Sequence, residues 1–263
     1  MKKTSKEYKV TYRTYFNERL KKCPFHTRLM HPLYVQVIFD RVPITFKSYY
    51  FDLFSQPKYA IRVGGEVFRP DIKEMIQKEE ALIEFIIEKN RDNFSLDLFK
   101  KEYAFYCRDL LDLMEGDFIY YLFTFLHDEG QPCLADAIKK GAADCKVYNI
   151  VQDMNRVFND KIYKKLFENS FYYAPPYLPL YAFTEKPKRT PLTCFSVMEW
   201  EQPGTKDEFT VFFKKHYPGQ RVEDVIREIQ KRADKINISK EKEEKRMRSV
   251  NGPVWARHQK EAE

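Results

Sequence analysis

No stretch of the sequence approaches the roughly 18 consecutive apolar residues that a membrane-spanning helix needs. The first residues are mostly charged or polar and lead into Tyr, Thr and Arg, where a secretory signal would have an apolar segment. An integral membrane protein or a secreted protein is therefore not expected.

Cysteine and glycine are scarce. The five cysteines are odd in number, lie far apart and never form a Cys-x-x-Cys pair, which argues against a disulfide framework and a zinc knuckle. Among the eight glycines there is no Gly-x-x-x-x-Gly-Lys, Gly-x-Gly-x-x-Gly or Gly-x-Ser-x-Gly pattern. We expect reduced cysteines, a cytoplasmic location, no cofactor and no enzymatic activity.

Two groups of residues have side chains of the types that bind metals. His127, Asp128 and Glu129 are consecutive, and consecutive helical residues point about 100° apart, so they cannot converge on one ion. His26 and His31 could share an ion with Cys23, but a fourth ligand is missing. A solvated helix end and a basic loop are the preferred interpretations, and no metal site is expected.

Positive charge is concentrated at the N-terminal end. Residues 1–60 contain 12 Lys and Arg against 4 Asp and Glu, a net charge of +8, whereas residues 61–263 contain 34 against 35, a net charge of −1. This asymmetry indicates that the first 60 residues bind a polyanion, with nucleic acid as the first candidate and acidic lipid as the second.

Three alternating runs of apolar and polar residues predict a small three-stranded antiparallel sheet. The strands are expected over residues 8–16, 33–39 and 42–50, with a hairpin turn at Asp40-Arg41. A helix that begins at Ser5 is the alternative for the first of them. From Pro70 onwards the apolar residues recur at helical spacing, so the fold class is α+β, with the sheet followed by a mainly α-helical body.

The helices are expected over residues 71–87, 95–110, 118–126, 134–140, 146–168 and 222–236. Residues 172–180 contain three prolines and predict a loop. The domains are then a basic sheet domain (1–60), a helical domain (61–170), a Pro/Tyr-rich segment with a C-terminal helix (171–239) and a charged mobile tail (240–263).

Seven basic residues of the first segment are the candidate DNA-binding residues. A sheet that carries basic side chains can enter a DNA groove, while flanking loops contact phosphates. The sheet residues are Lys9, Arg13, Arg41 and Lys47, and the phosphate-contacting residues are Lys21, Lys22 and Arg28. The pair Tyr49-Tyr50 is assigned to packing at the end of the sheet, with stacking on bases as the alternative.

The runs His31–Arg41 and Ile44–Ser48, together with the helix start Phe94–Phe99, carry a resemblance to a known family. Over about residues 8–105 the chain resembles the N-terminal arm-type DNA-binding region of tyrosine recombinases from mobile elements of Bacteroides-like bacteria. The chain departs from that family at Ser48–Phe51, and no His has an Arg three residues later. The resemblance therefore implies DNA binding and no catalytic residue.

These observations predict a non-catalytic DNA-binding protein, an accessory or regulatory factor of a mobile element or phage. Double-stranded DNA is the expected partner, a recombinase or another protein is a further candidate, and no membrane is involved. One alternative is a structural or interaction protein of a phage or mobile element whose sheet edge pairs with another protein. An enzyme with an unrecognised site is the third hypothesis.

Overall fold

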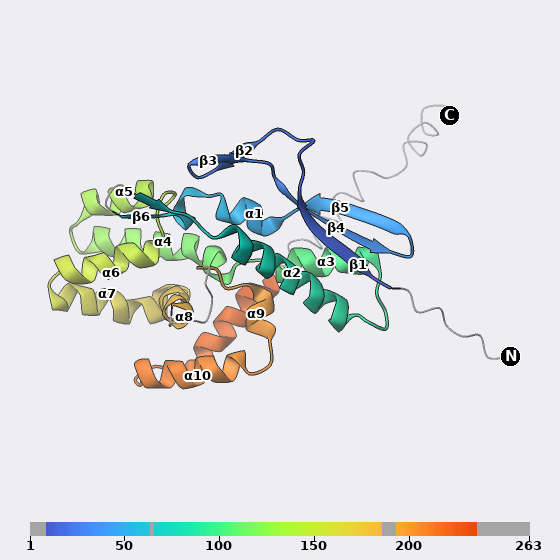
Figure 1. Ribbon diagram of the computed structural model, residues 1–263. Helices are drawn as coiled ribbons and strands as arrows, with labels where there is room; N and C mark the ends of the chain where they lie inside the picture. The colour runs from blue at the N-terminus through green and yellow to red at the C-terminus, as the bar shows by residue number, and fades with distance from the viewer. Residues whose placement is uncertain (1–8, 64–65, 186–192, 236–263) are drawn as a thin grey trace, which may run out of the picture.

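The computed structural model describes residues 9–63, 66–185 and 193–235. They form an α+β fold in which a small antiparallel sheet near the N-terminus precedes a mainly helical body, as Figure 1 shows. The expected fold class is therefore confirmed. The predicted tail, residues 240–263, lies outside the described residues, as does a possible helix start at Ser5.

The three predicted strands form one sheet with the order β1–β4–β5. Strand β1 (Thr11–Phe16) and strand β5 (Val42–Lys47) are shorter than expected, and strand β4 (Leu33–Phe39) has the expected bounds. Both neighbours of β4 are antiparallel to it. Pro43 lies on the edge strand β5, where a residue without an N–H is tolerated.

The turn between β4 and β5 consists of two residues, as expected. Asp40 and Arg41 have φ angles of +48° and +64°, the combination that a type I′ hairpin turn requires. This left-handed conformation suits Asn and Gly, and it is strained for a long side chain such as that of Arg.

Several short elements between residues 17 and 68 were not predicted. The expected basic loop contains a second hairpin, and the run that was assigned to the third strand turns into a helix at Tyr49, because Ser48 caps the N–H of Phe51. The additional elements are strand β2 (Cys23–Phe25), strand β3 (Arg28–Met30), helix α1 (Tyr49–Phe54), the 3-10 turn η1 (Pro57–Tyr59), strand β6 (Ile61–Val63) and strand β7 (Glu66–Phe68).

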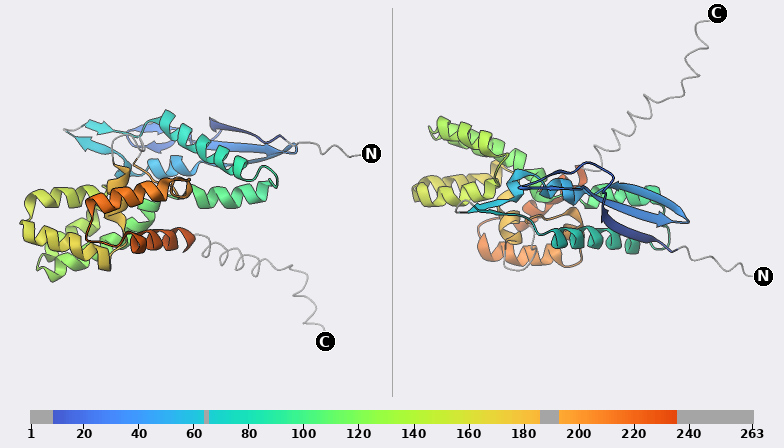
Figure 2. Two further views of the ribbon diagram at one scale, coloured as in Figure 1. Left: turned by 90° about the horizontal axis from the view of Figure 1, so that it is seen from below. Right: turned by 45° about the horizontal axis from the view of Figure 1, so that its top comes forward.

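Two helices cover one face of the sheet, as Figures 1 and 2 show. Helix α2 (Ile72–Lys89) begins after Asp71, whose carboxylate accepts hydrogen bonds from two backbone N–H groups of the first turn. Helix α3 (Leu96–Tyr106) begins after Ser95, which caps the N–H of Leu98. Both starts agree with the sequence analysis.

The third predicted helix begins earlier than expected. Helix α4 (Leu110–Asp128) runs through Gly116 and Asp117, whereas a helix had been predicted to begin only at residue 118. Its true cap is Asp109, whose buried carboxylate accepts a hydrogen bond from the N–H of Leu111. A glycine inside a helix lowers helix stability by only about 1 kcal/mol relative to alanine. The packing of the buried side chains of α4 outweighs this cost.

The single long helix predicted over residues 146–168 is in fact two. Helix α6 (Val147–Val157) ends at Phe158, and helix α7 (Asp160–Tyr173) begins after Asn159, whose side chain caps the N–H of Ile162. Asparagine is a strong N-cap, and the continuous apolar periodicity hid this break. Helix α5 (Pro132–Gly141) precedes them, close to its expected place.

The proline-rich segment 172–180 is not simply a loop. Helix α7 extends to Tyr173, and helix α8 (Tyr177–Thr184) follows, with Pro179 in its first turn. A proline is tolerated there because the first N–H groups of a helix have no partner within the helix. The prediction of a loop was therefore wrong for all but the short connection between these helices.

Three further helices complete the described part of the chain. Helix α9 (Val197–Glu201) and helix α10 (Thr205–His216) were not predicted, whereas the helical segment 222–235 was. Buried side chains from the sheet, the body and these helices join in one hydrophobic core. In the described part of the chain, no helix is long and apolar enough to cross a membrane.

The strained turn gives the first testable prediction. Replacing Asp40 by Asn and Arg41 by Gly should stabilise the fold by about 1 kcal/mol, because the left-handed conformation then costs less. For a chain of this size the melting temperature should rise by roughly 2–4 °C. Asp40→Asn with Arg41→Ala is the control, since it removes the same two charges and keeps a Cβ at residue 41. If the variant with Gly at residue 41 melted no higher than this control, the turn would not be strained.

Candidate nucleic-acid interface

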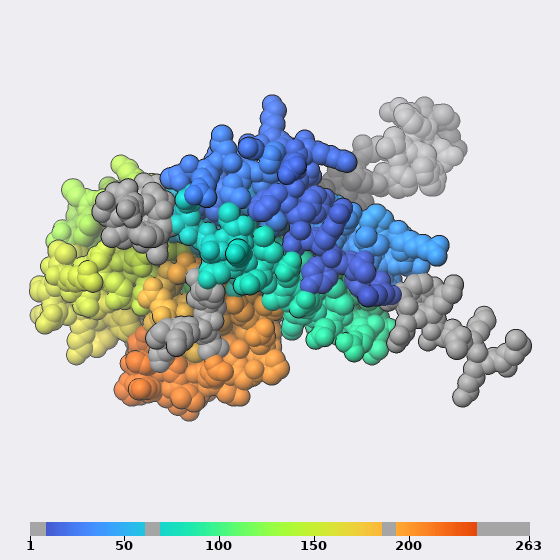
Figure 3. Space-filling view, viewed as in Figure 1, coloured from blue at the N-terminus to red at the C-terminus, as the bar shows by residue number. Residues whose placement is uncertain are grey.

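The sheet has one covered face and one open face. The alternating side chains of β4 show this division, because Leu33, Val35 and Val37 are fully buried while the residues between them are partly exposed. In the right-hand view of Figure 2 the three strands lie in front of α3, and Figure 3 shows the N-terminal segments at the surface. The register gives the open face nine strand residues: Thr11, Arg13, Tyr15, Tyr34, Gln36, Ile38, Pro43, Thr45 and Lys47.

The middle row of this face is polar. Arg13 on β1 pairs with Gln36 on β4, and Gln36 pairs with Thr45 on β5. The Gln36 amide donates a weak hydrogen bond to Thr45 Oγ1 at 3.4 Å. Because neighbouring strands lie about 4.8 Å apart, the axes of the two outer strands are about 10 Å apart along this row.

Two tyrosines extend the polar row on one side. Tyr15 and Tyr34 pair across β1 and β4, and their ring centroids are 6.4 Å apart. The Arg13 guanidinium lies 4.9 Å from the centre of the Tyr15 ring, within the range of a cation–π interaction. This contact restricts the arginine to a position above the open face.

Lys47 is on the open face, as expected, but its charge is partly neutralised. Its ammonium forms an ion pair with Asp52 of helix α1 at 2.5 Å. The hydrogen bond to Asp52 raises the pKa of Lys47. Lys47 is therefore the weakest of the predicted sheet contacts.

Two more predicted residues lie at the hairpin end of the sheet. Lys9 is exposed and precedes β1 at this end, because Thr11 pairs with Ile38 next to the turn. Arg41 is exposed in the turn itself. Within the described part of the chain, neither Lys9 nor Arg41 forms an ion pair, so both charges are available to a ligand.

The three residues assigned to phosphate contacts lie beyond the other end of the sheet. Lys21 and Lys22 are exposed in the connection between β1 and β2, and Arg28 is exposed on β3. The hairpin β2–β3 packs on helix α1 through Phe25, whose ring stacks on Phe51 at 5.4 Å. The structure therefore places Arg28 on a separate hairpin, and Lys21 and Lys22 in the connection that leads into it, so none of the three lies on the open face.

Tyr49 and Tyr50 are not available for stacking on bases. The side chain of Tyr50 is fully buried, and the half-buried Tyr49 accepts a hydrogen bond from the N–H of Asp109. Both residues belong to α1 and pack inside the fold, which agrees with the assignment of this pair to packing and not with stacking on bases. The aromatic residues of the open face are instead Tyr15 and Tyr34, which the alternation of the strands could have identified.

Hydrogen bonds to α2 fix strand β1 from its covered side. Tyr12 donates to Glu84 at 2.5 Å and Thr14 donates to Glu80 at 2.9 Å. Partial burial and the Glu84 carboxylate raise the pKa of Tyr12 to about 12. These two carboxylates approach the sheet from the side of the helices, so they do not neutralise the basic side chains on the open face.

A buried carboxylate holds the end of β5 to both helices beneath the sheet. Glu79 of α2 is fully buried and accepts hydrogen bonds from the Ser48 hydroxyl and from Tyr103 of α3, the latter at 2.6 Å. Burial raises the pKa of Glu79 to about 7, although the hydrogen bonds from Ser48 and Tyr103 oppose the shift. The sheet therefore rests on a polar anchor that depends on pH.

The histidines near the sheet have structural contacts. His26 Nε2 is 2.6 Å from the carbonyl oxygen of Phe54, and His31 Nδ1 is 2.9 Å from that of Leu20. Among the described residues, no three His, Cys, Asp or Glu side chains are placed to hold a metal ion.

A comparison with known proteins gives no further guide. The chain matches no family model, no curated protein and no solved structure. The arrangement of the side chains therefore carries the functional argument.

The raised pKa of Glu79 predicts that stability depends on pH. Between the ordinary value of 4.5 and the raised value of about 7, the folded chain keeps a proton that the unfolded chain releases. The free energy of unfolding should therefore fall by up to about 3 kcal/mol as the pH rises through this window. Glu79→Gln should remove this part of the decline.

Denaturant unfolding at several pH values measures the effect. Glu88→Gln, an exposed position on the same helix, is the matched control and should keep the pH dependence of the unchanged protein. If Glu79→Gln and Glu88→Gln gave parallel pH profiles, the shift at Glu79 would be refuted.

Proposed function

We propose that the open face of the sheet binds double-stranded DNA, and that the protein is a non-catalytic accessory or regulatory factor of a mobile element or phage. The row of Arg13, Gln36 and Thr45, on a face that no described helix covers, supports the proposal. The resemblance of residues 8–105 to the arm-type region of recombinases agrees with it.

The open face has side chains for both kinds of DNA contact. Arginine recognises guanine through its O6 and N7 atoms, and glutamine recognises adenine through N6 and N7, so Arg13 and Gln36 are suited to read base edges. Lys9 and Arg41 lie at the hairpin end of the sheet, where they can contact phosphates. In this proposal Lys21, Lys22 and Arg28 extend the phosphate contacts along the second hairpin.

Salt dependence tests the proposal, because a protein that contacts phosphates releases counterions. Each phosphate contact adds about 0.9 to the slope of the logarithm of affinity against the logarithm of salt concentration. Replacing Lys9, Arg13 and Arg41 by Ala should therefore reduce the magnitude of this slope by about 2, for the phosphate contacts of Lys9 and Arg41. Binding should weaken at every salt concentration, because the base contact of Arg13 is lost as well. Fluorescence anisotropy with labelled duplex DNA measures both effects.

A control variant distinguishes the loss of charges on the open face from the loss of the same number of charges elsewhere. Lys140, Lys161 and Lys215 are exposed on α5, α7 and α10, and their replacement by Ala removes the same three charges. This variant should keep the slope of the unchanged protein. Equal slopes for the two variants would refute the assignment of the face, and no DNA binding by the unchanged protein would refute the function.

A further inference from the structure

The hairpin β2–β3 has an outer face that no described element covers. Pro24 and Leu29 pair directly across its two strands, so their side chains lie on the same face. Both residues are exposed, and 66% of the Leu29 surface is accessible. Phe25, on the opposite face, is buried. In Figure 1 the hairpin lies above α1 and beside the sheet, and no other labelled element lies above it.

A second exposed leucine lies near the open end of the hairpin. Leu20 is 41% exposed. Its carbonyl oxygen is 2.9 Å from Nδ1 of His31, the residue that follows β3. Single exposed leucines are common on protein surfaces, but here two leucines and a proline belong to one short hairpin and the connection that leads into it.

Positive charges flank Leu29 at both ends of the hairpin. Lys21 and Lys22 directly precede β2 at the open end, and Arg28 begins β3 at the turn end. All three are exposed, and within the described ranges none of them forms an ion pair. The apolar side chain therefore lies between two groups of cations that are available to phosphates.

The hairpin rests on a rigid support. The Phe25 ring stacks on Phe51 at 5.4 Å, and His26 Nε2 is 2.6 Å from the carbonyl oxygen of Phe54. Both of these partners belong to α1. A side chain that has to enter a stack of bases meets resistance, so a supported strand holds it better than a loop would.

This arrangement fits bent DNA. Proteins that bend DNA insert an apolar side chain between two base pairs from the minor groove, while basic side chains hold the neighbouring phosphates. Membrane binding scales with the apolar area that is buried, and two leucines supply little of it. The right-hand view of Figure 2 shows the hairpin in front of α1, on the side of the molecule where the three strands of the sheet lie in front of α3.

We propose that Leu29 inserts between two base pairs from the minor groove and bends the duplex, while Lys21, Lys22 and Arg28 hold the phosphates on either side. This inference rests on the proposed function, because it requires that the protein binds duplex DNA. It adds that the bound duplex is kinked and that base steps with weak stacking are preferred.

The shape of the bound duplex tests the proposal. Förster transfer between dyes at the two ends of a duplex of about 20 base pairs should rise when the full chain saturates it, because a kink of roughly 20–90° shortens the end-to-end distance. Leu29→Ser should return the transfer to that of the free duplex while the duplex stays bound. Leu29→Met keeps an apolar side chain of similar volume and should keep the bend. Val211→Ser, exposed on α10, is the matched control and should also keep it.

A mismatched duplex provides a second measurement. One central mismatch weakens pairing and stacking at that point, so insertion of a side chain there costs less free energy. The unchanged protein should bind this duplex about ten-fold more tightly than the fully paired one. Leu29→Ser should bind both duplexes with equal affinity, because it has no side chain to insert.

The outcomes separate this inference from the proposed function. If the unchanged protein bound neither duplex, both proposals would be refuted. If it bound a duplex that stays straight, or if Leu29→Ser kept the bend, only the insertion of Leu29 would be refuted. A straight duplex together with Leu29-dependent binding to phosphatidylserine vesicles would assign the hairpin to a lipid surface instead.

Discussion

The buried carboxylate of Asp109 joins three segments that lie far apart in the sequence. It accepts hydrogen bonds from the Tyr59 hydroxyl and from the N–H groups of Leu111 and Phe195, all at 2.9–3.0 Å. Burial raises the pKa of Asp109, and the nearby charge of Lys146 opposes this shift. Since each buried donor left without an acceptor costs about 1–3 kcal/mol, this one side chain fixes the relative positions of the N-terminal elements, the central helix and the C-terminal helices.

A second buried carboxylate, that of Glu79, fixes one end of the sheet in the same way. Glu79 joins Ser48 to Tyr103, so the end of β5 cannot move without breaking buried hydrogen bonds. Polar groups on the covered side hold the strands, and the open side is then free to carry charges that have no structural task. Among the described residues of the open face, Lys47 combines both roles, because its ion pair with Asp52 ties the sheet to α1. A rigid base and a free surface together suit the contact with DNA that we propose for this face.

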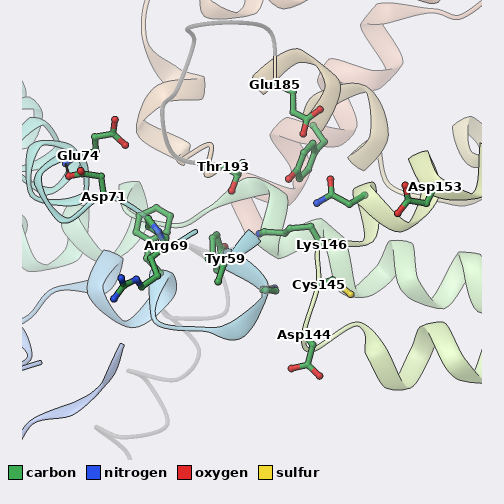
Figure 4. Close-up of a pocket in the computed structure, with 16 residues that line it drawn as sticks. Tyr59, Arg69, Asp71, Glu74, Asp144, Cys145, Lys146, Asp153, Glu185 and Thr193 are labelled. Carbon is green, nitrogen blue, oxygen red and sulfur yellow. Dashed lines mark hydrogen bonds between the residues drawn. The ribbon is translucent and has the colours of Figure 1, made fainter. Parts of the chain in front are cut away.

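Short sequence patterns predicted the strands and helices whose signals lie within a few neighbouring residues. Alternation placed β4, and the helix ranges expected from residues 71 and 95 agree with the starts of α2 and α3. The break at Asn159 was missed because apolar periodicity continued across it. At the candidate interface the sequence predicted the basic side chains, whereas the ion pair of Lys47 needs α1, which was not expected. The cavity lined by Tyr59, Lys146 and Thr193, among others (Figure 4), could not be foreseen, because packing alone brings these residues together from separate elements.

The antiparallel bridge between Asp109 and Ser196 has a consequence for how the molecule assembles during synthesis. Leu110 donates to the carbonyl of Phe195, and Val197 donates to that of Arg108. The sheet finds its supporting partners on α2 and α3, early in the chain, so it can form while later residues are still being translated. The bridge closes only after residue 197 has emerged. The junction that holds the C-terminal helices against the central helix is thus the last of these contacts to form.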